Sequence, residues 1–421
     1  MQRIAIVGSG IAGLGAAWLL EPSADVTVFE ATNRAGGHAN TVMVGEQPVD
    51  TGFIVLNDRN YPHFEGLLAE LDVPTRDSDM SFAASIGQGA IEWGGDSWRT
   101  LFAQKRRVLD SRHWRMIADI LRFNRQARHL IATDALPSMS LGEFLDRNRY
   151  SDAFAARYLL PMAAAIWSAP TANMRDFPVA AFLHFFNNHG LLELANRPQW
   201  KTIAGGSQRY VQAIAQRLGG RLRLATPVAS VRRDEQGAHV EMRSGAVETF
   251  DQVIFACHAD QTLALLYDAG AKERQLLSAF GFQPNRAILH SDVRLMPRHR
   301  KVWASWNYLA DRDAVDDQRV TVSYWMNRLQ SIPGDREYIV SLNPRVEPEP
   351  GQVIREIEYD HPVFDGDAIA AQERLDEIQG VNRAWFCGAW CGFGFHEDGL
   401  AAGVRVARAL GASVPWSVDN G

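Results

Sequence analysis

The N-terminal stretch RIAIVGSGIAGLGAAWLL constrains the fold more than any other part of the sequence. The β-branched run at residues 3–7 predicts a buried strand, and the Ala- and Leu-rich residues up to position 20 predict a helix. Between them Gly8, Gly10 and Gly13 have the spacing G-x-G-x-x-G, which presents the N-terminus of a helix to a pyrophosphate. Gly8 permits the tight turn, Gly10 permits close backbone approach, and Gly13 permits close packing of helix on strand. The stretch therefore predicts a Rossmann-like domain that binds a dinucleotide.

Three further signals follow the glycine-rich turn in a fixed order. A second predicted strand, DVTVFE, ends at Glu30, where an acidic side chain can bind ribose hydroxyls. The segment EATNRAGGHANT comes next and places Arg34 two residues before Gly36 and Gly37. A later strand leads into VDTGFIV, which contains Gly52.

Taken in order, these elements resemble the flavin amine oxidase and phytoene desaturase superfamily, in which an Arg-x-Gly-Gly element adds backbone N–H groups around the FAD pyrophosphate. The resemblance implies non-covalently bound FAD. It also implies an α/β fold: a Rossmann-like FAD-binding domain of the glutathione-reductase type, interleaved with a substrate domain of helices and a mixed sheet. The residues predicted to contact FAD are Gly8, Gly10, Ile11, Ala12, Gly13, Glu30, Ala31, Arg34, Gly36, Gly37, His38, Gly52, Phe53, Val228, Ala256, Gly388, Gly399 and Leu400.

The C-terminal stretch FCGAWCGFGFHEDGLAAG is rich in glycine, and the resemblance explains why. In the superfamily the chain returns to the cofactor with a strand, here RAWFCG, followed by a loop and a helix. The N–H groups near Gly399 and Leu400 are then expected to face the flavin, where a helix N-terminus favours the negative charge that reduction creates. Asp398 is expected to cap this helix, while His396 and Glu397 fit a site role and a scaffold role equally.

The distribution of these signals predicts two discontinuous domains in the 421 residues. Residues 1–75, 200–260 and 375–421 carry the nucleotide signals and are assigned to the FAD-binding domain. Residues 76–199, which read mainly as helices, and 261–374, which read as strands with alternating aromatic residues, are assigned to the substrate domain.

Composition excludes several other classes. The formal net charge is −6 and no long basic block occurs, so no nucleic-acid partner is expected. The three cysteines lack metal-ligand spacing, so no metal site is predicted. No apolar run is long enough to span a membrane, and the first strand begins too early for a signal peptide. We therefore expect a cytoplasmic protein, with peripheral contact to a membrane left open.

The candidate substrate follows from what the substrate-domain strands lack and from a second resemblance. In amine oxidases of the superfamily a lysine on such a strand holds a water at the flavin, whereas the segment AILHSDVRL has none and contains His290 instead. The motifs WKTIAGGSQRYV, SYWMNRLQ, YDHPVF and FHEDGL are similar to bacterial FAD-dependent oxidoreductases encoded beside cyclopropane-fatty-acid-synthase-type methyltransferases. This resemblance implies a lipid or another hydrophobic substrate, and a lipid methyltransferase as partner.

These observations give three hypotheses for the function. The first is removal of a hydride from a fatty acyl chain, free or bound in a phospholipid, with His290 or His396 as the base. The second is oxidation of an amine or an isoprenoid. The third is a flavin-binding partner of a lipid methyltransferase without catalysis of its own.

Overall fold

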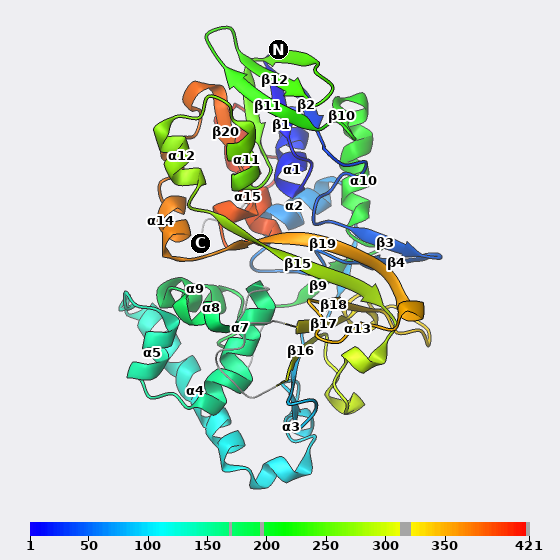
Figure 1. Cartoon of the computed structure of the whole chain (residues 1–421), viewed down its shortest axis with the longest axis vertical. Helices are drawn as coiled ribbons and strands as arrows, with labels where there is room; N and C mark the ends of the chain where they lie inside the picture. Colours follow the sequence, from blue (N-terminus) through cyan, green and yellow to red (C-terminus); the bar gives the residue numbers. More distant parts are fainter. Residues whose placement is uncertain (168–170, 194–197, 312–320, 418–421) are drawn as a thin grey trace.

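The computed structural model describes residues 1–167, 171–193, 198–311 and 321–417. The upper half in Figure 1 is built on a parallel sheet of five strands in the order β10-β2-β1-β14-β20. The strands are β1 (Arg3–Val7), β2 (Asp25–Phe29), β10 (Leu222–Arg223), β14 (Gln252–Phe255) and β20 (Ala384–Phe386). The N-terminal strand and the last strand thus belong to one sheet, with β14 between them.

Helices and a small sheet cover the two faces of this parallel sheet. One core contains α1 (Ile11–Leu20), α2 (Pro62–Glu70), α10 (Gln208–Leu218) and α15 (His396–Ala409). The other core contains the antiparallel sheet of β11 (Val228–Arg233), β12 (Ala238–Met242) and β13 (Val247–Phe250), together with α11 (Ala259–Leu265), α12 (Ala271–Leu277) and α14 (Gly366–Gln372). This two-sided arrangement confirms the predicted Rossmann-like fold class, because a parallel sheet must be covered on both faces.

The lower half contains a mixed sheet of seven strands in the order β19-β15-β18-β17-β16-β7-β8. These strands are β7 (Phe82–Ile86), β8 (Ile91–Gly94), β15 (Gly281–His290), β16 (Trp306–Ala310), β17 (Thr321–Trp325), β18 (Ile339–Leu342) and β19 (Val353–Val363). The pair β7 and β16 is parallel, and the other neighbours are antiparallel. Residues 76–199, which the sequence predicts as mainly helical, carry helices and also the strands β7 and β8.

Six helices and their connections lie against this sheet and share its core. They are α4 (Ser111–Ala132), α5 (Leu141–Arg147), α6 (Asp152–Phe154), α7 (Leu160–Trp167), α8 (Thr171–Asp176) and α9 (Val179–Asn188). The short helix α3 (Trp98–Leu101) contacts the edge strand β8, and α13 (Met326–Leu329) contacts the inner strands β17 and β18. The last residues of two segments expected to be helical, 168–170 and 194, lie outside the described residues. No helix in the described part of the chain is long and apolar enough to cross a membrane.

The longest strands, β15 and β19, run between the two halves in Figure 1. They pair antiparallel from Gly281 opposite Val363 to His290 opposite Val353. On β19 the Tyr359 hydroxyl lies 2.9 Å from Asn40 Nδ2 and 3.0 Å from Thr51 Oγ1, so it joins the lower sheet to the N-terminal segment. That segment carries β3 (Thr41–Val44) and β4 (Gln47–Asp50), while β5 (Leu56–Asn57), β6 (Thr75–Asp77) and β9 (Trp200–Ile203) form a further small sheet.

Candidate active site

A cavity of about 1220 Å³ begins at the turn between β1 and α1 and continues into the lower half of the molecule. Its upper end, which we call the cradle, is lined by sixteen of the residues predicted from sequence. They are Gly8, Gly10, Ile11, Ala12, Glu30, Ala31, Arg34, Gly36, Gly37, His38, Gly52, Phe53, Val228, Ala256, Gly388 and His396. Gly13, His290, Gly399 and Leu400 are not among the lining residues.

The glycines of the cradle leave room for a ligand at one position and pack tightly at others. A Cβ added to Gly10 would meet nothing within 4 Å, so the backbone at the start of α1 faces open space. A Cβ on Gly13 would lie 2.1 Å from the Gly8 carbonyl oxygen, and one on Gly37 would lie 3.2 Å from Gly10 Cα. Gly13 therefore packs the turn, as expected, while Gly10 and Gly37 bring two backbone segments to one open site. This shape fits a pyrophosphate at a helix N-terminus.

Glu30 and Arg34 are both held in place by the loops around them. The Glu30 carboxylate accepts hydrogen bonds from the N–H groups of Ser9 at 3.1 Å and Thr32 at 2.9 Å, and from both of their hydroxyls. This fixes a carboxylate at the end of β2, where a ribose is expected. The Arg34 guanidinium donates to the carbonyls of Gly37 at 2.6 Å and Ala39 at 2.9 Å, so it braces the loop that contains the Gly-Gly pair.

Three histidines form a neutral cluster beside the cradle. The ring of His38 lies 6.3 Å from that of His258 and 5.4 Å from that of His361, and it stacks on Tyr359 at 4.9 Å. Burial lowers the pKa of all three, to about 4 for His361, so the rings are uncharged at neutral pH. The His38 Nε2 atom is buried without a hydrogen-bond partner among the described residues. An unpartnered buried nitrogen at the cavity wall fits a site built for a polar ligand.

Tyr359 and His361 are not among the site residues predicted from the sequence, although both lie in the motif YDHPVF. Both residues belong to β19, which the alternation of the sequence does not reveal because five of its eleven residues are Arg, Glu, Asp or His. Their partners in the cradle are more than 300 residues away in the chain. The period-2 position of Tyr359 and His361 on one face of a strand was the one available signal.

The residues at the start of α15 are scaffold residues. The two carboxylate oxygens of Glu397 accept the N–H groups of His63 at 2.8 Å and Phe64 at 2.9 Å, so Glu397 caps α2. Asp398 accepts the N–H groups of Phe393 and Phe395 and caps its own helix, as expected. Both acids therefore hold the C-terminal loop against the rest of the upper half.

His396 lines the cradle but is positioned by packing. Its Nε2 lies 2.8 Å from the Tyr210 hydroxyl, and its ring stacks on Phe53 at 3.8 Å. Burial lowers the pKa of His396 to about 3, so the ring is uncharged at neutral pH. Its position favours the scaffold role over the role of a base.

Gly399 and Leu400 lie one turn deeper in α15 than the resemblance implies. The N–H of Gly399 donates to the Phe395 carbonyl at 3.1 Å, so the free N–H groups of the helix are those of residues 396–398. Leu400 is fully buried, and a Cβ on Gly15 of α1 would lie 2.3 Å from its Cδ1 atom. These two residues pack α15 on α1, and neither faces the cavity.

His290, the other predicted base, lies away from the cavity. It is fully buried at the end of β15, with Nε2 2.8 Å from Ser341 Oγ, while Nδ1 accepts the N–H of Asp292 at 3.0 Å. Both ring nitrogens are therefore engaged inside the lower sheet. The position of His290 gives no support to a role in proton transfer to a substrate.

The lower end of the cavity, which we call the chamber, is walled by apolar and aromatic side chains. One row runs across four strands of the mixed sheet in register: Phe82 opposite Trp306, Trp306 opposite Tyr324, and Tyr324 opposite Val340. The rest of the wall comes from neighbouring strands and helices and includes Met80, Trp93, Leu101, Ile117, Ile120, Tyr158, Met162, Ile166, Trp167, Phe185, Leu191, Ala287, Leu342, Ile357, Phe364, Phe393 and Phe395.

The charged residues along the cavity lie mostly at its upper end. Glu30 and Arg34 belong to the cradle, and Glu358 and Asp360 belong to β19 beside it. Asp96 lines the lower part and is paired with Arg328 at 2.9 Å. No lysine lines the cavity in the part of the chain that the structure describes.

The sequence matches the model of the family described as flavin containing amine oxidoreductase over residues 11–297. It is 28% identical over 283 residues to the Mycobacterium tuberculosis protein named "Putative flavin-containing monoamine oxidase AofH". That match covers 63% of this chain, and the chain spans 59% of the length of that relative.

Three solved structures share the fold over 97% of this chain and 98% of each of theirs. They are the cyclohexylamine oxidase from Brevibacterium oxydans IH-35A (TM-score 0.70, 15% identity), a putrescine oxidase bound to putrescine (0.69, 17%) and a CLA-producing fatty acid isomerase from P. acnes (0.68, 16%). At these identities the likeness shows the fold alone. The family match covers more than half of the sequence, and the cradle fits the dinucleotide cofactor of that family. The chain therefore belongs to the flavin-containing amine oxidoreductases, and the cradle is its candidate site for FAD.

Proposed function

We propose that the protein removes a hydride from a long, uncharged hydrophobic substrate, the acyl chain of a fatty acid or of a phospholipid. The observation that carries this proposal is the continuity of the cavity, which leads from the cradle into a chamber of aromatic and aliphatic side chains. An extended acyl chain gains free energy by leaving water for such a wall, at about 0.8 kcal/mol for each buried CH₂ group.

The distribution of charge favours an uncharged chain over an ammonium group. The carboxylate that lines the lower part of the cavity, Asp96, is already paired with Arg328. An ammonium group deep in the chamber would lose its hydration without gaining a carboxylate from the described wall residues, and that transfer is costly. A methylene chain pays no such cost.

When it is bound, FAD would supply the acceptor for the hydride, which is two electrons and one proton. The protein must then exclude water, align the C–H bond and accept the second proton when a C=C bond forms. His189 is the histidine that the described chamber residues offer for that proton. Its Nδ1 lies 3.0 Å from the Phe185 carbonyl, so the ring proton sits on Nδ1 and the Nε2 lone pair remains to accept. Burial lowers the pKa of His189 to about 4, which keeps this nitrogen unprotonated at neutral pH.

The proposal is tested by mixing the FAD-loaded protein without oxygen with a long-chain fatty acid, with a detergent-dispersed phospholipid, and with an alkyl amine of equal length. We expect loss of the visible absorbance of oxidised flavin with the acyl compounds and not with the amine. Reduction by the amine alone would contradict the proposal. Absence of reduction by every compound would favour a non-catalytic partner of a lipid enzyme.

A variant that shortens the chamber adds a second test. It compares acyl chains of different length on the same protein, so the amount of folded protein does not affect the result. Ala287 lies on β15 between Ile357 of β19 and Leu342 of β18, and all three side chains line the chamber. Ala287→Phe should fill this part of the wall and shift the preferred acyl length to shorter chains. A folding defect would lower reduction by all chain lengths equally, whereas a shift in the preferred length requires the chain to lie against β15.

Amine oxidation is the second candidate, and the Mycobacterium tuberculosis relative is the observation that favours it. The fatty acid and the amine of equal length differ only in the head group, so the same experiment decides between the two. An isoprenoid alcohol added to the series tests whether the substrate is an isoprenoid, the other substrate class in the second hypothesis.

A further inference from the structure

We propose that the surface formed by residues 98–128 docks on an anionic lipid bilayer and places the open end of the chamber against it. The function of this docking, delivery of an acyl chain, rests on the function proposed above. The docking itself rests on exposed side chains, charge and the course of the cavity.

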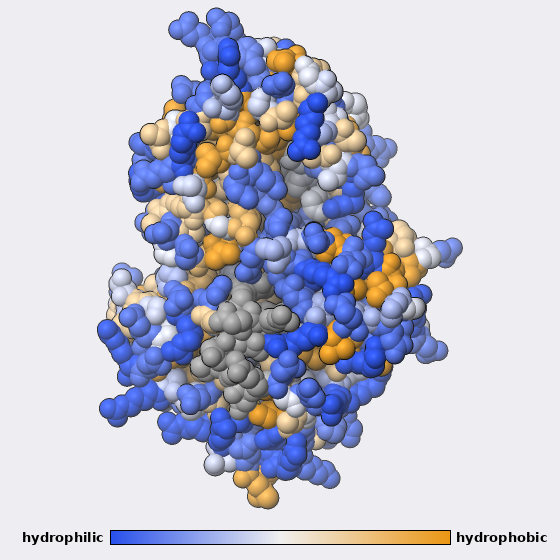
Figure 2. Space-filling model, in the orientation of Figure 1, coloured by the Kyte–Doolittle hydropathy of each residue, from blue (hydrophilic) through white to orange (hydrophobic). Residues whose placement is uncertain are grey.

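Five exposed apolar side chains gather in this segment. Trp98, Val108, Leu109, Trp114 and Leu121 are 66%, 50%, 91%, 46% and 51% exposed, and they lie on α3, on the short helix at residues 105–109 and on the first half of α4. These elements form the lower end of the molecule, opposite the N-terminus (Figure 1). Figure 2 shows hydrophobic residues at this end set among hydrophilic ones. We call this surface the apolar tip.

The side chains of the apolar tip are in contact with one another. Trp98 stacks on Phe102 with ring centres 6.0 Å apart, and Phe102 lies 5.0 Å from Trp114. The Trp114 indole N–H donates to the Val108 carbonyl at 2.8 Å, which fixes the turn that carries Leu109. Contiguous exposed aromatic and aliphatic groups of this kind mark an interaction surface on a soluble domain. Tryptophan in particular is favoured at the level of lipid head groups.

The segment is strongly basic within an acidic protein. Residues 98–128 contain nine Lys or Arg and two Asp, a formal charge of +7, while the whole chain has −6. Both aspartates are already neutralised by arginine: Asp110 lies 2.7 Å from Arg107, and Asp119 lies 3.0 Å from Arg122. Local charge of this sign and density complements an anionic lipid surface and repels a basic partner.

Along one stripe of α4 the apolar residues come before the basic ones, although Arg112 and Arg115 are also exposed near Trp114. At 3.6 residues per turn, Trp114, Leu121, Arg125 and Arg128 fall on one stripe of the helix, and all four are exposed. The apolar pair comes first from the tip, and the arginines follow about 6 to 10 Å further along the axis. When the apolar side chains enter the boundary between head groups and acyl chains, the arginines therefore reach the phosphates.

The cavity joins this surface from inside. Trp98 and Leu121 are exposed members of the apolar tip and also line the cavity, together with Leu101 and Ile117. A lipid chain that leaves the bilayer at the tip therefore meets side chains that also line the chamber.

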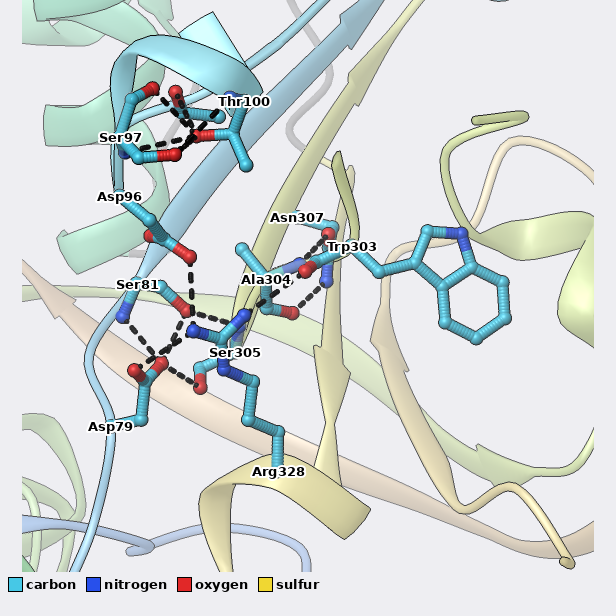
Figure 3. Close-up of polar contacts among 11 residues, drawn as sticks. Asp79, Ser81, Asp96, Ser97, Thr100, Trp303, Ala304, Ser305, Asn307 and Arg328 are labelled. Carbon is cyan, nitrogen blue, oxygen red and sulfur yellow. Dashed lines mark hydrogen bonds and ion pairs between the residues drawn. The ribbon is translucent and has the colours of Figure 1, made fainter. Parts of the chain in front are cut away.

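A rigid network holds the base of the tip on the mixed sheet, as Figure 3 shows. Arg328 donates to Asp79 at 3.0 Å and to Asp96 at 2.9 Å, and Asp79 also accepts from the Ser305 hydroxyl at 2.7 Å. Ser97 and Thr100 form a capping box that starts α3. Trp98 is thus presented by a fixed segment, which reduces the entropy lost on docking.

The test is sedimentation of the FAD-loaded 421-residue protein with vesicles of phosphatidylcholine, pure or mixed with phosphatidylglycerol. We expect binding to the mixed vesicles that weakens as salt rises, and far weaker binding to the pure ones. Leu109→Asp should lower the partition coefficient about tenfold or more, because the variant loses the leucine side chain that the wild type buries in the bilayer. Arg125→Gln with Arg128→Gln should lower it roughly 25-fold at low salt, because each basic residue near an anionic surface contributes about fivefold.

Leu224→Asp is the matched control, because Leu224 is a 40% exposed leucine in the upper half that lines no part of the cavity. This variant should bind the vesicles like the wild type, and all variants should keep their flavin. The proposal is overturned if the wild type does not sediment with the mixed vesicles, or if Leu109→Asp binds as well as the control. Equal binding to both vesicle types would also overturn it, since the basic residues would then have no role. No turnover is involved, so this assay and the flavin-reduction experiment can fail independently.

Discussion

Both the sequence motif and the structure require the absence of a side chain at Gly10 if FAD is to bind there. Its φ of −68° is open to any residue, and a Cβ there would meet nothing within 4 Å, so alanine should not disturb the fold. The same Cβ would occupy space needed by the pyrophosphate. We expect Gly10→Ala to weaken FAD binding about tenfold or more, corresponding to about 1.4 kcal/mol or more, with the melting temperature of the FAD-free protein unchanged.

The measurement is titration of the FAD-free protein with FAD, followed by quenching of flavin fluorescence. Gly351→Ala is a suitable control, because its Cβ also meets nothing within 4 Å but lies outside the cavity. Native affinity in Gly10→Ala would show that the pyrophosphate does not lie at the start of α1.

Glu397 gives the protein a pH dependence with a defined sign. Burial raises the pKa of Glu397 to about 8, although the N–H groups of His63 and Phe64 act in the opposite direction. In the unfolded chain the pKa is the ordinary 4.5, so between about pH 5 and pH 8 the folded protein holds the extra proton. The free energy of unfolding therefore falls as the pH rises through this window.

Glu397→Gln tests this linkage. The amide cannot ionise and accepts one of the two N–H groups, so the variant should be less stable than the wild type at pH 5 by about 1 to 3 kcal/mol. The difference should shrink towards pH 8, because only the wild type loses stability at this site. Melting temperatures of both proteins across that range supply the test, and parallel profiles would show that Glu397 does not titrate there. Asp398, whose pKa is raised to about 6 by burial, is common to both proteins and cancels.

Single residues could be predicted from sequence where a local backbone pattern defines their place. Gly8, Gly10 and Glu30 follow from the order of strand, turn, helix and strand, because their partners lie within about 30 residues. His290 could not be placed in this way. Its burial against Ser341 depends on the pairing of β15 with β18, and a histidine in a strand sequence looks the same whether it faces a cavity or a neighbouring strand.

At the scale of elements, the contact of α1 with α15 sets the width of the cradle. A Cβ on Gly403 of α15 would lie 2.4 Å from the Ala12 carbonyl oxygen, so the two helices meet backbone to backbone. Alanine elsewhere in a helix is favoured over glycine by about 1 kcal/mol. Here the clash should outweigh that gain, and we expect Gly403→Ala to lower the free energy of unfolding by about 1 to 3 kcal/mol.

Urea unfolding followed by far-UV circular dichroism measures this effect. Gly366→Ala in α14, where a Cβ would meet nothing within 4 Å, should be neutral or slightly stabilising. If Gly403→Ala were as stable as that control, the close approach of α1 and α15 would be wrong.

The elements differ in how far the sequence could specify them. The parallel strands β1, β2, β14 and β20 are short apolar runs followed by glycine, an acidic residue or a helix, and each is found from its own residues. Strand β19 is 11 residues long, but only one of its side chains is buried and five are Arg, Glu, Asp or His, so its hydrogen bonds to β15 define it. Strands β7 and β8 lie in a stretch of sequence dominated by helix. They are defined by pairing with each other and by the pairing of β7 with β16 in the mixed sheet.

At the scale of the whole molecule, FAD binding and folding should be linked across both halves. The cradle draws residues from 8–53, 228–256 and 388–396, while β15, β19 and the Tyr359 hydroxyl connect it to the mixed sheet. FAD at about 100 times its dissociation constant should add about 2.7 kcal/mol to the free energy of unfolding. We expect one transition, seen together by tryptophan fluorescence and far-UV circular dichroism, that moves to higher temperature with FAD. Two transitions, of which FAD moves one, would show that the halves unfold separately.

The position of β20 and α15 has a consequence for biosynthesis. The sheet that begins with residues 3–7 receives its last strand from residues 384–386, and the helix that closes the cradle follows at residues 396–409. A chain still attached to the ribosome before those residues emerge has the glycine-rich turn but lacks the opposite wall. Flavin capture must therefore follow synthesis of residues 384–409, and a chain that stops before them should be unable to retain FAD.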